Sequence, residues 1–211
     1  MIVKKLSVLD CVLVGLENAL SVSSFSKPNF NFKFNLPVPD LSVADCKRSA
    51  RLLRVNHAGE VCAQALYLGQ ACATSDPVLR SEFIRAAGEE KEHLRDCAQR
   101  LKELKASPSL LNPIWGLGSL ALGYTLGRFG KGLSLGFMAE TERQVMRHIE
   151  DHLEQLPMAD GVSRDLLEQM HRDESEHAHW AQEQGGADLP ILIKRLMQSM
   201  AAVFRTITKY I

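Results

Sequence analysis

The chain has 211 residues, which is enough for one well-buried domain and too few for two comfortable ones. Its 25 basic residues balance its 25 acidic residues, so the composition does not point to a nucleic-acid-binding protein, which would need a basic surface. The five cysteines form no C-x-x-C pair and leave one over, unlike the disulfide framework of a small secreted domain. These features predict a single hydrophobic core.

Residues 1–40 are expected to form an N-terminal amphipathic helix followed by an extended linker. Lys4 and Lys5 precede an apolar stretch, as in a signal peptide, but Asp10 and Glu17 interrupt that stretch and no A-x-A-like cleavage site follows. The second half of the segment has phenylalanines and prolines among Ser, Asn and Lys. This composition is typical of a linker whose aromatic side chains attach it to a larger domain.

From about Leu41 the apolar residues recur with helical periodicity. Ser42 is placed to cap a helix that runs to about Thr74, and the run Ser75-Asp76-Pro77 ends it and begins the next. The second helix is expected to end near Lys105. Its apolar stripe includes one glutamate and consists of Phe83, Ala87, Glu90, Leu94, Cys97, Leu101 and Leu104.

A glycine-rich apolar segment covers residues 110–137 and contains Arg128 and Lys131. These interruptions make it a poor candidate for a transmembrane helix. The last segment, residues 186–211, is apolar on one side, and from Leu189 onward it carries basic residues and no acidic ones, a pattern that fits a helix lying in an anionic membrane interface. We expect both segments to face a membrane, with packing in the core or in a dimer as the alternative.

Two more long helices are expected, from about Lys131 to Leu156 and from about Asp160 to Gln184. The stripe of the first consists of Leu135, Met138, Glu142, Val145, Ile149 and Leu153, and that of the second of Leu166, Met170, Glu174, His177 and Ala181. A charged residue in an apolar stripe costs free energy unless it is paired or binds a metal. Four helices with this anomaly therefore predict a buried metal site.

The charged residues in these stripes follow a doubled pattern, in which a lone glutamate precedes a Glu-x-x-His pair by about thirty residues in each half of the chain. Residues three apart on a helix lie on one face, roughly 4.5 Å apart along the axis, so both can reach one ion. Four carboxylates and two imidazoles on four helices are the ligand set of ferritin-like di-iron and di-manganese bundles. The candidate metal ligands are Glu60, Glu90, His93, Glu142, Glu174 and His177.

Other polar residues near the motifs receive different assignments. Two further Glu-x-x-His pairs fall away from the apolar stripe: Glu168/His171 and Glu176/His179. We expect four further glutamates either to face solvent or to support the ligands: Glu89, Glu92, Glu140 and Glu176. We expect His152 and His171 to lie on the surface. Three more residues are candidates for a place beside the metal site, where they could bond to a ligand or to substrate: His57, His148 and Tyr67. For each of them, ordinary packing without a chemical role is the alternative.

Four short runs resemble the demethoxyubiquinone hydroxylases of ubiquinone biosynthesis: R-V-N-H-A-G-E at 54–60, E-E-K-E-H at 89–93, A-E-T-E at 139–142 and D-E-S-E-H-A at 173–178. The resemblance implies a di-iron monooxygenase that inserts one atom of O₂ into the ring of a polyprenyl methoxy-benzoquinol. It implies two irons per chain on the six candidate ligands, with the four glutamates as the catalytic carboxylates. Analogy with the motif's geometry makes Glu90 and Glu174 the expected bridging ligands.

The whole pattern predicts an all-α, ferritin-like four-helix bundle at residues 41–185 with additional membrane-interfacial helices. The expected partners are the quinol, a membrane surface and an external electron donor, with a biosynthetic complex and a second copy of the chain as further candidates. A mitochondrial leader would be rich in Arg and Ser and poor in acids, so Asp10 and Glu17 favour the cytoplasmic side of a bacterial inner membrane. The alternatives are a di-metal peroxidase or catalase, an iron-storage subunit, and a structural bundle without metal.

Overall fold

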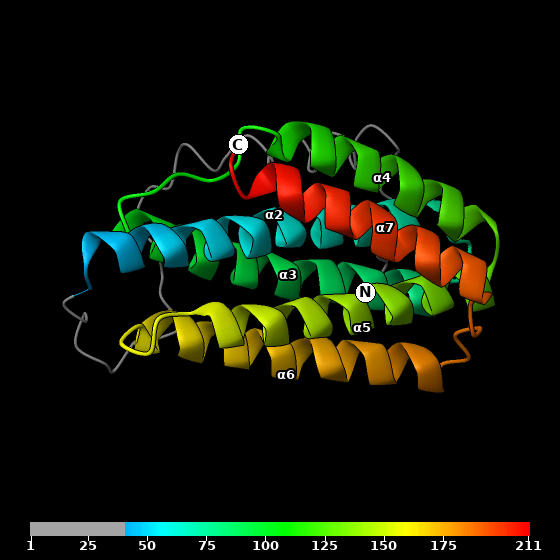
Figure 1. Cartoon of the computed structure of the whole chain (residues 1–211). Coiled ribbons are helices and arrows are strands. Elements are labelled where there is room, and N and C mark those ends of the chain that lie inside the picture. Colours follow the sequence, from blue (N-terminus) through cyan, green and yellow to red (C-terminus); the bar gives the residue numbers. More distant parts are fainter. Residues whose placement is uncertain (1–40) are drawn as a thin grey trace.

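The computed structural model describes residues 41–211, which are helical with short connections and contain no strand (Figure 1). The predicted N-terminal helix and linker lie outside the described residues. The helices are α2 (Val43–Ala73), α3 (Pro77–Glu103), α4 (Asn112–Arg128), α5 (Lys131–Gln155), α6 (Gly161–Glu183) and α7 (Ile191–Thr208). The four long helices expected from the sequence are confirmed, with ends that differ by only a residue or two.

Local side-chain chemistry explains where three of these helices begin. The Ser42 side chain accepts a hydrogen bond from the backbone N–H of Asp45 at the start of α2. Asp76 caps α3, whose first residue is a proline, and Asp160 caps α6 by accepting from the backbone N–H of Ser163. Such caps satisfy backbone N–H groups that have no partner inside the helix.

The helices form a bundle of α2, α3, α5 and α6, and α4 and α7 lie next to each other along one side of it (Figure 1). Helix α2 packs against both α3 and α4, and α5 packs against α6. The rings of Trp115 and Phe204, 5.2 Å apart and edge to face, join α4 to α7. Among residues 41–211, no helix has both the length and the apolar character needed to cross a membrane.

The core consists of two apolar clusters at different depths along the bundle. One contains Tyr67, Phe83 and Leu135, and the other contains Leu101 and Met170. The glutamates of the predicted stripes fall between these clusters in every long helix, so a polar layer separates two apolar ones. Tyr67 is stacked on Phe83 with ring centroids 6.3 Å apart, which places it in core packing.

Small residues let α4 lie almost in contact with the backbone of α2. A Cβ atom at Gly123 would stand 2.0 Å from the carbonyl oxygen of Leu66, and one at Gly69 would stand 2.3 Å from that of Leu120. Neither neighbour is the flexible end of a side chain, so the clash could be relieved only by moving the helices apart. Gly123 and Gly127 therefore serve close helix packing on the side of α4 that faces α2.

Gly123→Ala is expected to lower the free energy of unfolding by about 3 kcal/mol, because it overpacks this contact. Gly118→Ala is the matched control on the same helix, since a Cβ there meets nothing within 4 Å. Alanine is the better helix former, so the control should be unchanged or stabilised by up to about 1 kcal/mol. Urea denaturation of both variants measures the difference, and equal stabilities would contradict the close α2–α4 contact.

Candidate metal centre

The structure brings all six predicted ligands together in the polar layer. The long helices contribute them as Glu60 from α2, Glu90 and His93 from α3, Glu142 from α5, and Glu174 and His177 from α6. All six side chains are buried, with no more than 7% of any residue exposed. Helical spacing explains the arrangement, because each Glu-x-x-His pair lies on one face of its helix.

The ligand atoms form two overlapping groups. One group consists of Glu60, Glu90, His93 and Glu174, and the other of Glu90, Glu142, Glu174 and His177; in each, the atoms lie within 4.8 Å of one another. Glu90 and Glu174 belong to both groups. A carboxylate with one oxygen toward each of two ions is what a bridging ligand requires, so this geometry supports the expected bridging pair.

The Nδ1 atoms of both imidazoles face the carboxylates. His93 Nδ1 is 3.3 Å from Glu90 Oε2 and 3.4 Å from Glu174 Oε1. His177 Nδ1 is 3.2 Å from Glu174 Oε2 and 3.3 Å from Glu90 Oε1. The Nδ1 atoms are therefore the candidate metal-binding nitrogens.

The Nε2 atoms point away from the centre, each toward an acidic residue on the opposite helix. His93 Nε2 is 3.0 Å from Asp173 Oδ2, and His177 Nε2 is 2.7 Å from Glu89 Oε2. A carboxylate on the outer nitrogen fixes the ring orientation and the tautomer and makes the inner nitrogen a better ligand. Glu89 thus supports a ligand, which is one of the two roles expected for it. The same role of Asp173 was not predicted from the sequence. The pattern that could have indicated it is that Asp173 directly precedes Glu174, just as Glu89 directly precedes Glu90.

Shifted pKa values in the polar layer favour bound protons on several of the candidate ligands. Burial, and next the charges of Glu90 and Glu174, raise the pKa of Glu60 well above its usual range. Burial also raises the pKa of Glu142. Burial alone would lower the pKa of His177, but hydrogen bonds with Glu174 and Glu90 outweigh it and raise the value to about 12. Metal binding must displace these protons, so the affinity for metal should fall as the pH falls.

The donor atoms fit a pair of hard or borderline metal ions. Both carboxylate oxygens of Glu142 are buried and have no hydrogen-bond partner among the described residues. Such oxygens cost free energy unless a cation or a donor satisfies them. Carboxylate and imidazole ligands without thiolate suit iron or manganese and argue against a zinc ribbon or an iron–sulfur cluster.

Three buried histidines lie outside this ligand set. His148 Nε2 is 3.1 Å from Asn56 Oδ1, and the Asn56 side-chain amide donates to His152 Nδ1 at 3.0 Å. His57 Nδ1 similarly lies 3.3 Å from the amide of Asn112. Each therefore has an asparagine partner rather than one of the six ligands.

The surface position predicted for His152 is wrong, because only 6% of the residue is exposed. Its partner Asn56 comes from another helix, and such a contact cannot be seen in the periodicity of one segment. Glu140 is also buried, bonded to the amide of Gln144 and to Arg147, so a solvent face is wrong for it. His171 is partly exposed and paired with Glu150, close to what was expected.

Asp173→Ala is expected to lower the affinity for metal about 10- to 100-fold, because His93 loses the group that orients its ring. Asp165→Ala is the control, since Asp165 is an exposed acid on the same helix. Competition with a chromophoric chelator measures the affinity. Wild-type affinity in Asp173→Ala would show that the outer carboxylate does not support the ligand.

Comparison with known proteins agrees with this geometry. Residues 47–208 match the family described as "Ubiquinone biosynthesis protein COQ7". The chain is 49% identical over 207 residues to a protein of Paraburkholderia xenovorans and 48% identical over 200 residues to one of Paraburkholderia phytofirmans. Both are named 3-demethoxyubiquinol 3-hydroxylase, and each alignment covers 93% of this chain and 94% of the relative.

The matched region contains all six clustered ligands and all of the described helices except the first four residues of α2. The resemblance noted in the four short motifs is therefore confirmed over most of the chain. The protein belongs to the COQ7 family of ubiquinone biosynthesis proteins.

Proposed function

We propose that this protein is a 3-demethoxyubiquinol 3-hydroxylase, a di-iron monooxygenase of ubiquinone biosynthesis. The observation that carries the proposal is the buried layer of four glutamates and two histidines in two overlapping groups. The relatives that match nearly the whole chain bear the name of this activity. In the reaction a ring C–H becomes C–OH and the second oxygen atom becomes water, with two electrons and two protons from an external reductant.

Each part of the layer has a separate task in this proposal. The six ligands hold two irons, and the bound irons supply the activation of O₂. Asp173 and Glu89 keep the imidazole rings in place. The apolar clusters on both sides of the layer exclude bulk water from it, which strengthens the electrostatic interactions inside.

The test is to load purified protein with iron-57 and then add a demethoxyubiquinol analogue, a reductant and O₂. About two coupled irons per chain by Mössbauer spectroscopy, together with a hydroxylated quinone, would support the proposal. Two irons without product would favour a peroxidase or catalase. Many irons per chain in a large shell would favour storage, and an absence of bound iron would favour a structural bundle.

We also propose that α4 and α7 face the inner membrane on its cytoplasmic side and take the prenylated substrate from it. Apolar side chains are exposed along both helices, including Ile114, Leu117, Leu192, Leu196, Met200 and Val203. Helix α7 adds basic residues and has no acidic one. In this organisation residues 41–185 form the catalytic bundle and residues 186–211 the membrane-associated helix.

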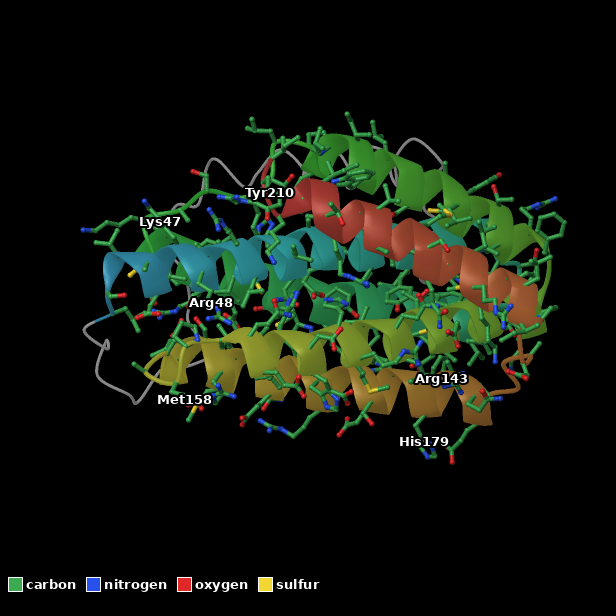
Figure 2. All side chains as sticks on the ribbon, viewed as in Figure 1. Lys47, Arg48, Arg143, Met158, His179 and Tyr210 are labelled. Atoms are coloured by element: carbon green, nitrogen blue, oxygen red, sulfur yellow. The ribbon has the colours of Figure 1, made fainter. Side chains whose placement is uncertain are left out.

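Leu196→Asp with Met200→Asp is expected to move the protein from the membrane fraction to the soluble fraction, because aspartate cannot enter an apolar interface cheaply. Val78→Asp with Met158→Asp is the matched control, since both are exposed apolar residues that belong to neither α4 nor α7. Figure 2 shows Met158 on the far side of the bundle from α7. Flotation on liposomes measures binding; unchanged flotation of the α7 variant would refute this role.

A further inference from the structure

A groove with basic walls runs between the start of α2, the end of α5 and the end of α7. Two adjoining cavities form it, one of ≈ 170 Å³ and one of ≈ 310 Å³. Both are lined by Gln155 and Lys209, so they are neighbouring parts of one depression. We call this feature the basic groove.

The charges in the basic groove are unbalanced. Arg48 and Arg51 line the larger cavity, and Arg205 lines the smaller one; Lys209 lines both. Asp151 is the one acidic residue among the lining residues. Within the part of the chain that the structure describes, none of the four cations lies within 4.0 Å of a carboxylate oxygen. Four neighbouring cations repel one another, and a bound anion would reduce this repulsion.

Contacts between helices hold the groove in shape. The guanidinium of Arg51 lies 5.6 Å from the ring centroid of Tyr210, in stacking position. Arg54 donates to the carbonyl oxygens of Ser107 at 2.9 Å and of Lys209 at 3.2 Å. These bonds fix the last turn of α7 against α2 (Figure 2, where Arg48 and Tyr210 are labelled). The fold therefore sets the positions of these cations, which do not lie on a free loop.

The inner wall of the smaller cavity is polar and uncharged. It consists of His148 and His152, which are joined through Asn56. Burial and the nearby charges lower the pKa of His148 to about 3 and that of His152 to about 4. The positive charge of the groove at neutral pH thus comes from its arginines and its lysine.

We propose that the basic groove binds a phosphate-bearing ligand, whose oxygens are held by Arg48, Arg51, Arg205 and Lys209. A planar guanidinium can give two parallel hydrogen bonds to a phosphate, and three such groups surround this groove. The ligand is either the headgroup of an anionic phospholipid, since the groove lies at the end of α7, or a soluble phosphate compound. The groove is formed apart from the metal ligands, so this inference does not depend on the proposed hydroxylase activity.

The test compares full-length, iron-loaded wild type with a groove variant, Arg51→Gln with Lys209→Gln. Lys91→Gln with Arg164→Gln is the control, which removes two positive charges on the α3 and α6 side. A second groove variant, Arg48→Gln with Arg205→Gln, leaves the Arg51–Tyr210 contact intact. One assay measures binding to phosphatidylcholine vesicles with and without phosphatidylglycerol, and the other measures inorganic pyrophosphate binding by calorimetry at constant ionic strength.

Both groove variants are expected to lose roughly 30-fold in affinity in one of the two assays, while the control keeps wild-type affinity. A loss confined to phosphatidylglycerol vesicles identifies a lipid headgroup, and a loss of pyrophosphate binding identifies a soluble phosphate. The proposal is overturned if wild type binds neither probe, if the groove variants bind like wild type, or if the control loses as much as they do.

Discussion

Glu174→Ala is expected to abolish quinol hydroxylation and to reduce bound iron below one per chain. Glu174 belongs to both groups of ligand atoms, so its loss removes one candidate ligand from each group at once. The effect should exceed the roughly 10- to 100-fold loss of affinity expected when an outer supporting group is removed. Iron analysis and product formation from a demethoxyubiquinol analogue measure it.

Glu176→Ala is the matched control, because Glu176 is an exposed glutamate two residues further along α6. A loss of the site must also be separated from a loss of folding. The urea midpoint of metal-free Glu174→Ala, compared with that of metal-free wild type, measures any loss of folding separately from the loss of iron. Full activity with two bound irons in Glu174→Ala would refute the assignment of this residue as a ligand.

Asp160→Ala is expected to destabilise the protein by about 3–5 kcal/mol, because it removes the fully buried carboxylate partner of Arg100, which keeps only the less buried Glu103, and also removes the cap of α6. Asp160 Oδ1 is 2.7 Å from Arg100 Nη2, and the two side chains are at most 1% exposed. Arg100 also donates to Ser163 at 3.0 Å and to Glu103 at 2.9 Å. Chemical denaturation at pH 7 measures the loss, and Asp165→Ala again serves as the exposed control.

The pH dependence gives this prediction a second readout. Burial opposes ionisation of Asp160, but hydrogen bonds from neighbouring serines and the charge of Arg100 outweigh it and lower its pKa. A lowered pKa contributes stability above the unfolded-state value, and that stability is lost as the pH falls through the folded-state value. The difference between wild type and Asp160→Ala should therefore shrink in acid. Replacing both partners with apolar residues, Arg100→Met with Asp160→Leu, should cost much less than Asp160→Ala alone.

Much of the bundle could be predicted from the sequence because its signals are local. Ser42, Asp76 and Asp160 act on backbone groups within a few residues, so their effect can be read without knowing the fold. The periodic stripes place Glu90 and Glu174 on buried faces, and the structure confirms their burial. The doubled spacing then indicates that they meet at one depth.

The parts that could not be predicted depend on contacts between helices. His152 looks like a surface residue in its own segment and is buried because Asn56 reaches it from α2. Asp173 has no apolar stripe around it, and its role appears only when His93 of α3 lies opposite. The glycines of α4 suggested an apolar membrane segment, whereas one side of that helix is used for backbone contact with α2.

The crossed outer carboxylates give the centre an approximate twofold symmetry. The hairpin of α2 and α3 and the hairpin of α5 and α6 each supply a lone glutamate, a Glu-x-x-His pair and an acid for the other hairpin's histidine. The two groups of candidate ligands are therefore nearly equivalent within the bundle itself. Helix α4 packs closely on α2, whereas the counterpart of α2, helix α5, makes only slight contacts with α4 and α7. Two ions bound there would therefore differ chemically through the unequal packing around α2 and α5, and through the pairing of one histidine with an aspartate and the other with a glutamate.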